Sequence, residues 1–242
     1  MSLVLYQFPI SHYCEKVRWA LDYKGLQYKT KSMVPGAHIK ITTKMAPRSS
    51  VPVLEHNGKA VQGSSQIITY LDEKFPDKKL TPVNSQAKQA ALEWEKYLDN
   101  EIGIHVRRYL YHTVLQHRGL SVGFFTAGAP FWTKPILWIA FPKLVKRMRK
   151  FMDINPATAE QSKQHIEKAL KRINEAVVDN KFLTSEGFSR ADLTAAALLA
   201  PLFMPPQYGL QWPSHFPEPL ETEVKAMAPQ LEWAKAIYAK YR

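Results

Sequence analysis

Strand-forming patterns are confined to the first third of this chain, and this restriction decides which folds it can adopt. Within residues 1–78, short apolar runs alternate with helical patterns. Beyond Asn84 the chain shows helical periodicity almost throughout. We therefore expect a small α/β domain over residues 1–78, a linker over 79–84 and an all-helical domain over 85–242.

The order of elements in the first domain is that of a thioredoxin fold. The expected elements are a strand at Leu3–Phe8, a helix from Tyr13 to Gly25, strands at Leu26–Thr30, Val51–His56 and Lys59–Gln62, and a helix from Ser64 to Phe75. Asn57-Gly58 is a strong two-residue hairpin signal between the last two strands. With a weak helix among the irregular residues 32–46, the order is β-α-β-α-β-β-α, and a thioredoxin-like domain is predicted.

The loop Ser11-His12-Tyr13-Cys14 joins the first strand to the first helix. It has the spacing of a Cys-x-x-Cys redox loop with serine in the first position. Backbone N–H groups and the helix dipole stabilise an anion at such a helix start, including a thiolate. Ser11 could steady a thiolate that a cofactor brings, or simply cap the helix. Cys14, one turn inside the helix, is the alternative nucleophile.

Composition narrows the class of protein. The 242 residues carry a net charge of +12, from 33 basic and 21 acidic side chains. Anionic partners are therefore possible, but no basic run alternates with stacking aromatics, and we expect no nucleic-acid binding. The single cysteine excludes an intrachain disulfide. With no signal peptide and no long apolar stretch apparent, a cytoplasmic, soluble protein is expected.

Four motifs follow one another along the chain. They are the loop and helix start Cys14–Leu21, the segment Ala46–Leu54 that contains Val51-Pro52, the helix start Ser64–Leu71, and the capping-box sequence Phe188–Leu193. In this order and spacing the chain resembles the cytosolic glutathione S-transferase (GST) superfamily, as a serine-type or unclassified member, over essentially its whole length.

The resemblance implies a glutathione site in the first domain. Ser11 would donate a hydrogen bond to the thiolate of glutathione, the co-substrate. Val51, before a cis-Pro52, would pair with the peptide backbone, and Gln62, Ser64 and Ser65 would lie at its γ-glutamyl end. Tyr6, one residue from the tyrosine position of other classes, is expected to lie in the core.

The resemblance also implies an activity and partners. The enzyme would be a homodimer that transfers the glutathione thiolate to an apolar electrophile, as in detoxification. Family members commonly place Glu, Gln or Asp before the serine at the glutamyl site, whereas this chain has Gly63. Two alternatives therefore stay open: a non-catalytic binding protein for hydrophobic ligands, and a thiol transferase that depends on Cys14.

Two segments of the helical domain bear on a second substrate. His105, Arg108, Tyr109 and His112 share one helix face and are the candidate contacts to a hydrophobic small molecule. Two histidines seven residues apart could suggest a metal site, but the sequence places no third ligand beside them, and none is expected. An insertion at about 119–150 joins aromatic residues to a basic cluster, which would suit a lid over an apolar site, internal or subunit packing, or weak membrane-surface contact.

Overall fold

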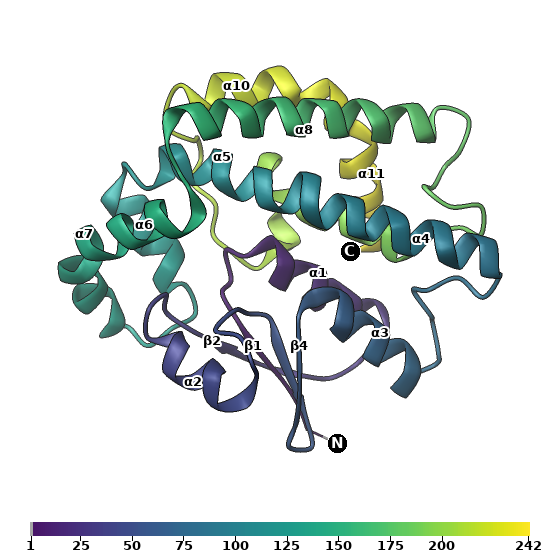
Figure 1. The fold of residues 1–242 in the computed structure, drawn as a ribbon, viewed down its shortest axis with the longest axis horizontal. Coiled ribbons are helices and arrows are strands. Elements are labelled where there is room, and N and C mark those ends of the chain that lie inside the picture. Colours follow the sequence, from purple (N-terminus) through teal and green to yellow (C-terminus); the bar gives the residue numbers. More distant parts are fainter. Residues whose placement is uncertain (1) are drawn as a thin grey trace.

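The protein, described by a computed structural model over residues 2–242, has an α/β part followed by a helical part (Figure 1). The α/β part contains β1 (Leu3–Gln7), α1 (His12–Tyr23), β2 (Lys29–Ser32), α2 (His38–Met45), β3 (Val53–His56), β4 (Lys59–Gln62) and α3 (Ser64–Lys74). The helical part contains α4 (Ser85–Leu98), the π-helical turn η1 (Asp99–Gly103), α5 (Ile104–Val114), α6 (Arg118–Thr126), α7 (Thr133–Met152), α8 (Pro156–Val177), α9 (Arg190–Leu199), α10 (Leu220–Met227) and α11 (Glu232–Tyr241), with three short 3₁₀ turns, η2 (Ala200–Leu202), η3 (Pro206–Tyr208) and η4 (Ala228–Leu231). The predicted fold class is confirmed.

The sheet has the strand order β2-β1-β3-β4. β1 pairs with β2 in parallel and with β3 in antiparallel, and β3 and β4 form the predicted hairpin. The second strand begins later than the sequence suggested, at Lys29, because Leu26 belongs to the turn that follows α1: its N–H donates back to Leu21 O at 3.0 Å. The segment before β3, expected to be mostly irregular, contains α2.

The long helical pattern after Asn84 is not one straight helix. A π-helical turn, η1, separates α4 from α5 and leaves them in line (Figure 1). The insertion forms α6 and α7, at the same end of the molecule as α2 (Figure 1). No helix within residues 2–242 is both long and apolar enough to cross a membrane.

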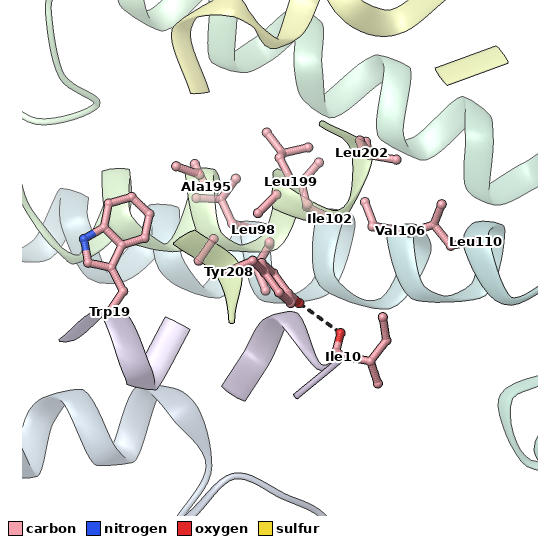
Figure 2. Close-up of a cluster of buried hydrophobic side chains, with 14 of the residues drawn as sticks. Ile10, Trp19, Leu98, Ile102, Val106, Leu110, Ala195, Leu199, Leu202 and Tyr208 are labelled. Carbon is pink, nitrogen blue, oxygen red and sulfur yellow. Dashed lines mark hydrogen bonds between the residues drawn. The ribbon is translucent and has the colours of Figure 1, made fainter. Parts of the chain in front are cut away.

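The hydrophobic core joins the two parts. Figure 2 shows Trp19 of α1 and Ile10 of the loop beside apolar side chains of α4, α5 and α9. α9 is buried on all sides, and its predicted capping box is present, with Ser189 and Asp192 as the reciprocal partners. Tyr208, fully buried, donates its hydroxyl to Ile10 O at 2.9 Å (Figure 2). The helical part thereby holds the loop that carries Ser11.

Candidate functional site

Ser11 is the N-cap of α1. Its Oγ accepts a long hydrogen bond from Cys14 N, at 3.4 Å, and its own hydroxyl hydrogen has no acceptor among the described residues. The side chain is half-buried and lines a large cleft. The N-cap role and the site role are therefore compatible: the hydroxyl can cap the helix and still donate to an anion in the cleft.

The cleft has a volume of about 1210 Å³. It lies between the Ser11 loop, α2 and the cis-proline segment on one side, and α5, α6 and α7 on the other. Its walls are mostly apolar, and among the described residues no acidic side chain lines it, whereas five basic side chains do: Lys31, Arg107, Lys143, Arg147 and Lys150. Such a cleft suits a large apolar ligand that carries negative charge.

Cys14 lies outside the group of described residues that line the cleft. It is fully buried, and burial raises the pKa of its thiol. A thiol with a raised pKa is mostly protonated at neutral pH and is a weak nucleophile. The geometry therefore favours Ser11 over Cys14 as the reacting-centre residue.

The Val51–Pro52 peptide bond is cis, as the sequence suggested. Val51 lines the cleft, and neither its N–H nor its C=O has a hydrogen-bond partner among the described residues. Gln62 is committed elsewhere: its amide donates to Arg48 O at 2.6 Å and Ser50 O at 2.7 Å, and accepts from Arg48 N. Gln62 therefore positions the segment before Val51 and has no free N–H for a ligand.

The start of α3 lies next to this segment, since Gly63 N donates to Pro52 O at 3.1 Å. Ser64 is buried and its hydroxyl has no partner among the described residues. Ser65 is engaged: its hydroxyl donates to Asp99 Oδ2 at 2.7 Å and accepts from Lys16 Nζ at 3.2 Å. Of the two predicted serines, Ser64 is the one whose hydroxyl is available to a ligand.

Gly63 has a positive φ of 99°, which L side chains rarely adopt. A Cβ at this position would overlap Oε1 of Gln66, and Arg48 Nη2 would lie 3.4 Å away. The carboxamide of Gln66 thus occupies the place where an acidic side chain at residue 63 would start. Gln66 was not among the predicted site residues, although its place three residues after the N-cap Gly63 is the spacing of a capping box.

A buried ionic network fixes the start of α3 to the helical part. Lys16, fully buried, lies 2.9 Å from Glu95 and 3.0 Å from Asp99. Arg190 contacts Glu95 at 2.6 Å and donates to Ser65 O at 2.9 Å. Burial raises the pKa of Glu95, but the charges of Lys16 and Arg190 outweigh it and hold that pKa below its usual value.

None of the four predicted second-substrate residues lines the cleft. Arg108 donates to Met152 O at 3.0 Å, and Tyr109 donates to Glu223 at 2.6 Å. His105 is bonded to Ser162 of α8 at 3.1 Å, and burial beside His165 lowers its pKa to about 4. His112 too is absent from the lining.

The cleft is instead lined by the opposite face of α5: Arg107, Leu110, Tyr111 and Val114. The predicted face of α5 was therefore the wrong one. The spacing predicted that the four residues share a face of the helix, but it could not show that this face packs on α8 and α10 and not on the cleft.

Arg107 is the one charge that α5 brings into the cleft. Its Nε is buried without a hydrogen-bond partner, and within residues 2–242 no carboxylate forms an ion pair with its guanidinium. Burial lowers the pKa of His12, which follows Ser11, to about 3, and the positive charge of Arg107 contributes to this lowering. His12 is therefore neutral, and its Nε2–H donates to Gly103 O at 2.9 Å. An unpaired cation thus lies close to the Ser11 loop.

The insertion forms one wall of the cleft. Phe124 and Phe125 of α6 are buried in it, while Trp132 and Ile136 line it and remain 55% and 59% exposed. Part of the exposed apolar surface therefore lies on the rim of the cleft, whereas Phe131 and Ile139, which are 89% and 80% exposed, lie outside its lining. This geometry favours the lid interpretation of residues 119–150 over packing alone.

Comparisons with known proteins point to one family. Residues 5–79 match the family model for the glutathione S-transferase N-terminal domain. Glutathione S-transferase 1 of Dianthus caryophyllus is 39% identical over 90 residues, which are 36% of this chain and 41% of that protein. The matched segment spans less than half the length of the first curated relatives.

Solved structures share the fold over nearly the whole chain. A glutathione S-transferase from Rhodospirillum rubrum F11 has a TM-score of 0.66 at 18% identity and covers 98% of this chain and 88% of that one. One from Methylobacillus flagellatus, solved with glutathione bound, has a TM-score of 0.59 at 22% identity and covers 98% of both chains. Residues 5–79 therefore match the glutathione S-transferase N-terminal domain family, and the whole chain shares the fold of solved glutathione S-transferases.

Proposed function

We propose that this protein is a glutathione transferase that transfers the thiolate of glutathione to a large apolar electrophile with an anionic group. The observation that carries the proposal is the arrangement around Ser11. Its free hydroxyl hydrogen, the start of α1 and the unpaired backbone of Val51 all border one cleft. In use, the Ser11 hydroxyl would donate to the thiolate and lower its pKa, as hydrogen bonding to a charged form does.

The peptide part of glutathione would lie along Val51. An extended peptide can pair with a free backbone N–H and C=O as a strand would. Its glutamyl carboxylate would meet the start of α3, with the Ser64 hydroxyl, the first free N–H groups and Arg48 nearby. The carboxamide oxygen of Gln66 would accept from the glutamyl ammonium and replace the acidic side chain absent at Gly63.

The electrophile would occupy the wide part of the cleft between α2, α5 and α7. The apolar walls fit its body, and Arg107 fits an anionic group such as a carboxylate, since a cation without a partner in an apolar site binds an anion strongly. The five basic side chains of the lining favour the same charge. The proposal also includes a homodimer, a cytoplasmic location and a role in detoxification, because these are the properties that the resemblance to glutathione S-transferases implies.

Calorimetric titration with glutathione tests the binding step. We expect saturable heat with the wild type, weaker binding in Gln66→Ala, and unchanged binding in Gln161→Ala, which removes an exposed glutamine of α8. Absence of heat at millimolar glutathione would contradict the proposal and favour a non-catalytic carrier of amphipathic anions. The size and charge of the cleft are the observations that support that second candidate.

A further inference from the structure

Exposed apolar side chains gather at one end of the molecule. Ten large apolar side chains are exposed within residues 2–242, and eight of them lie on α2 or between Phe131 and Phe151. These two segments, which we call the apolar tip, lie at the same end of the fold (Figure 1). The most exposed of the eight are Phe131, Ile139 and Phe151. Such a concentration of exposed apolar surface marks a site of interaction.

A lid over the cleft accounts for only part of the apolar tip. The exposed isoleucines of α2 line the cleft, as do Trp132, Ile136 and Phe151. Phe131 and Ile139 lie outside the lining, so a ligand bound in the cleft leaves both side chains in water. These two residues therefore call for a partner outside the cleft.

Helix α7 has an exposed amphipathic pattern in addition to the side that packs into the core. The core side is formed by buried residues four and seven positions apart, Leu137, Phe141 and Met148. The exposed side begins with Ile136 and Ile139. Three lysines follow on that side at spacings of three or four residues: Lys143, Lys146 and Lys150. Apolar residues next to lysines on an exposed helix face are typical of a helix that lies in a membrane–water interface.

The charge of this region has one sign. Residues 118–152, which include α6 and α7, contain seven Lys and Arg residues and no Asp or Glu, and α2 contains two lysines and no acidic residue. All of these basic side chains except Arg118 are exposed, and within residues 2–242 none of them forms an ion pair. Exposed cations without partners are attracted to the anionic headgroups of a bilayer.

We propose that the apolar tip docks on the surface of a bilayer that contains anionic lipids. Phe131 and Ile139 enter the boundary of the acyl chains, and the lysines of α7 meet the headgroups. Apolar side chains stand on both sides of the cleft, on α2 and on α7, and a fluid surface covers two edges of a hollow without a matching shape. The contact is peripheral, since no helix within residues 2–242 could cross a membrane. It does not rest on the proposed transferase function, because Phe131 and Ile139 lie outside the cleft lining.

Sedimentation of the full chain with lipid vesicles tests the docking. We expect binding to vesicles of phosphatidylcholine mixed with phosphatidylserine, and weaker binding without phosphatidylserine or at high salt. The partition coefficient should fall about 10-fold or more in the double variant Phe131→Ser/Ile139→Ser, and about 5-fold in Lys146→Gln. The matched controls are Val178→Ser and Lys168→Gln, which change exposed residues at and on α8 and should leave binding unaltered.

Two results would overturn the proposal. The first is no sedimentation of the wild type with phosphatidylserine vesicles; a lower mass of the double variant in lipid-free solution would then identify the tip as a contact between copies of the chain. The second is equal partition of the wild type and the double variant, which would place the lipid contact on another face.

Tryptophan fluorescence gives a second readout of which face meets the bilayer. Trp132 and Trp138 are the exposed tryptophans of the apolar tip. Lipids with brominated acyl chains should quench the emission of the vesicle-bound wild type, because tryptophan side chains settle at the membrane interface. This quenching should be lost in Trp132→Phe/Trp138→Phe. Quenching that is unchanged in that variant would overturn the placement of the tip on the membrane.

Discussion

Arg107 and Arg108 are neighbours in the chain, yet their side chains lie on different faces of α5. Arg107 lines the cleft without a carboxylate partner among the described residues, whereas Arg108 donates to Met152 O. Adjacent residues of a helix point about 100° apart, so a shift of one position decides whether a charge meets a ligand or the protein interior. Under the proposed function, Arg107 is therefore the side chain of α5 that would contact the anionic group of the electrophile.

Replacement of Arg107 by leucine should change selectivity more than overall activity. We expect kcat/KM for electrophiles with a carboxylate to fall about 10-fold relative to neutral analogues, because one charge-assisted hydrogen bond is lost. Steady-state kinetics with matched pairs of charged and neutral electrophiles measure this ratio. Arg108→Leu is the control and should leave it unchanged. An unaltered ratio in Arg107→Leu would remove Arg107 from the site.

At the scale of elements, the junction of α1, α3, α4 and α9 depends on buried charge. Lys16 of α1 is paired with Glu95 and Asp99, and Arg190 of α9 joins Glu95 to the start of α3. Because buried charges are costly without partners, the four elements are held in one register. The backbone at Ser64 and Ser65 is positioned by this register.

Replacement of Lys16 by methionine should destabilise the fold strongly. The substitution removes the positive charge beside Glu95 and Asp99. Removing one partner of such a buried pair lowers the free energy of unfolding by about 3–5 kcal/mol. Chemical denaturation measures the loss. Lys171→Met, which removes an exposed pair with Glu175 at 3.9 Å, should cost under about 0.5 kcal/mol. Equal small losses in both variants would show that the network does not hold the elements together.

For the whole molecule, the sequence predicted the features that depend on local pattern and missed those that depend on packing. The thioredoxin-like order, the cis-proline segment, the cap at Ser11 and the capping box at Ser189 are local patterns, and each is present. The cleft-lining face of α5 was missed because the rotation of that helix is set by its packing on α8. Gln66 is an exception, since it was missed although it lies three residues after the N-cap Gly63, at the spacing of a capping box.

The stability of the whole molecule should depend on His12 in acid. Its pKa is lowered from 6.5 to about 3 in the folded state, by burial and by Arg107. Between these values the unfolded chain binds a proton that folded His12 does not, so the free energy of unfolding falls as pH falls. His12 alone should remove about 2 kcal/mol between pH 6.5 and pH 5.

Denaturant titrations of the wild type and His12→Gln at several pH values isolate this contribution. Asp192 titrates with the opposite sign, since burial raises its pKa to about 6, so the difference between the two proteins is the informative quantity. That difference should shrink as pH falls from 6.5 towards 3. A difference that does not vary with pH would show that His12 is not held neutral.

The central claim, that Ser11 stabilises the thiolate of bound glutathione, is tested most directly by the pKa of that thiol. Ultraviolet absorbance of the thiolate, titrated with pH in the complex, measures it. The pKa should lie clearly below the usual thiol value of about 8.5 in the wild type and return towards it in Ser11→Ala, with kcat falling about 10²-fold. The same thiol pKa in both proteins, with glutathione bound to each, would contradict the assignment of Ser11.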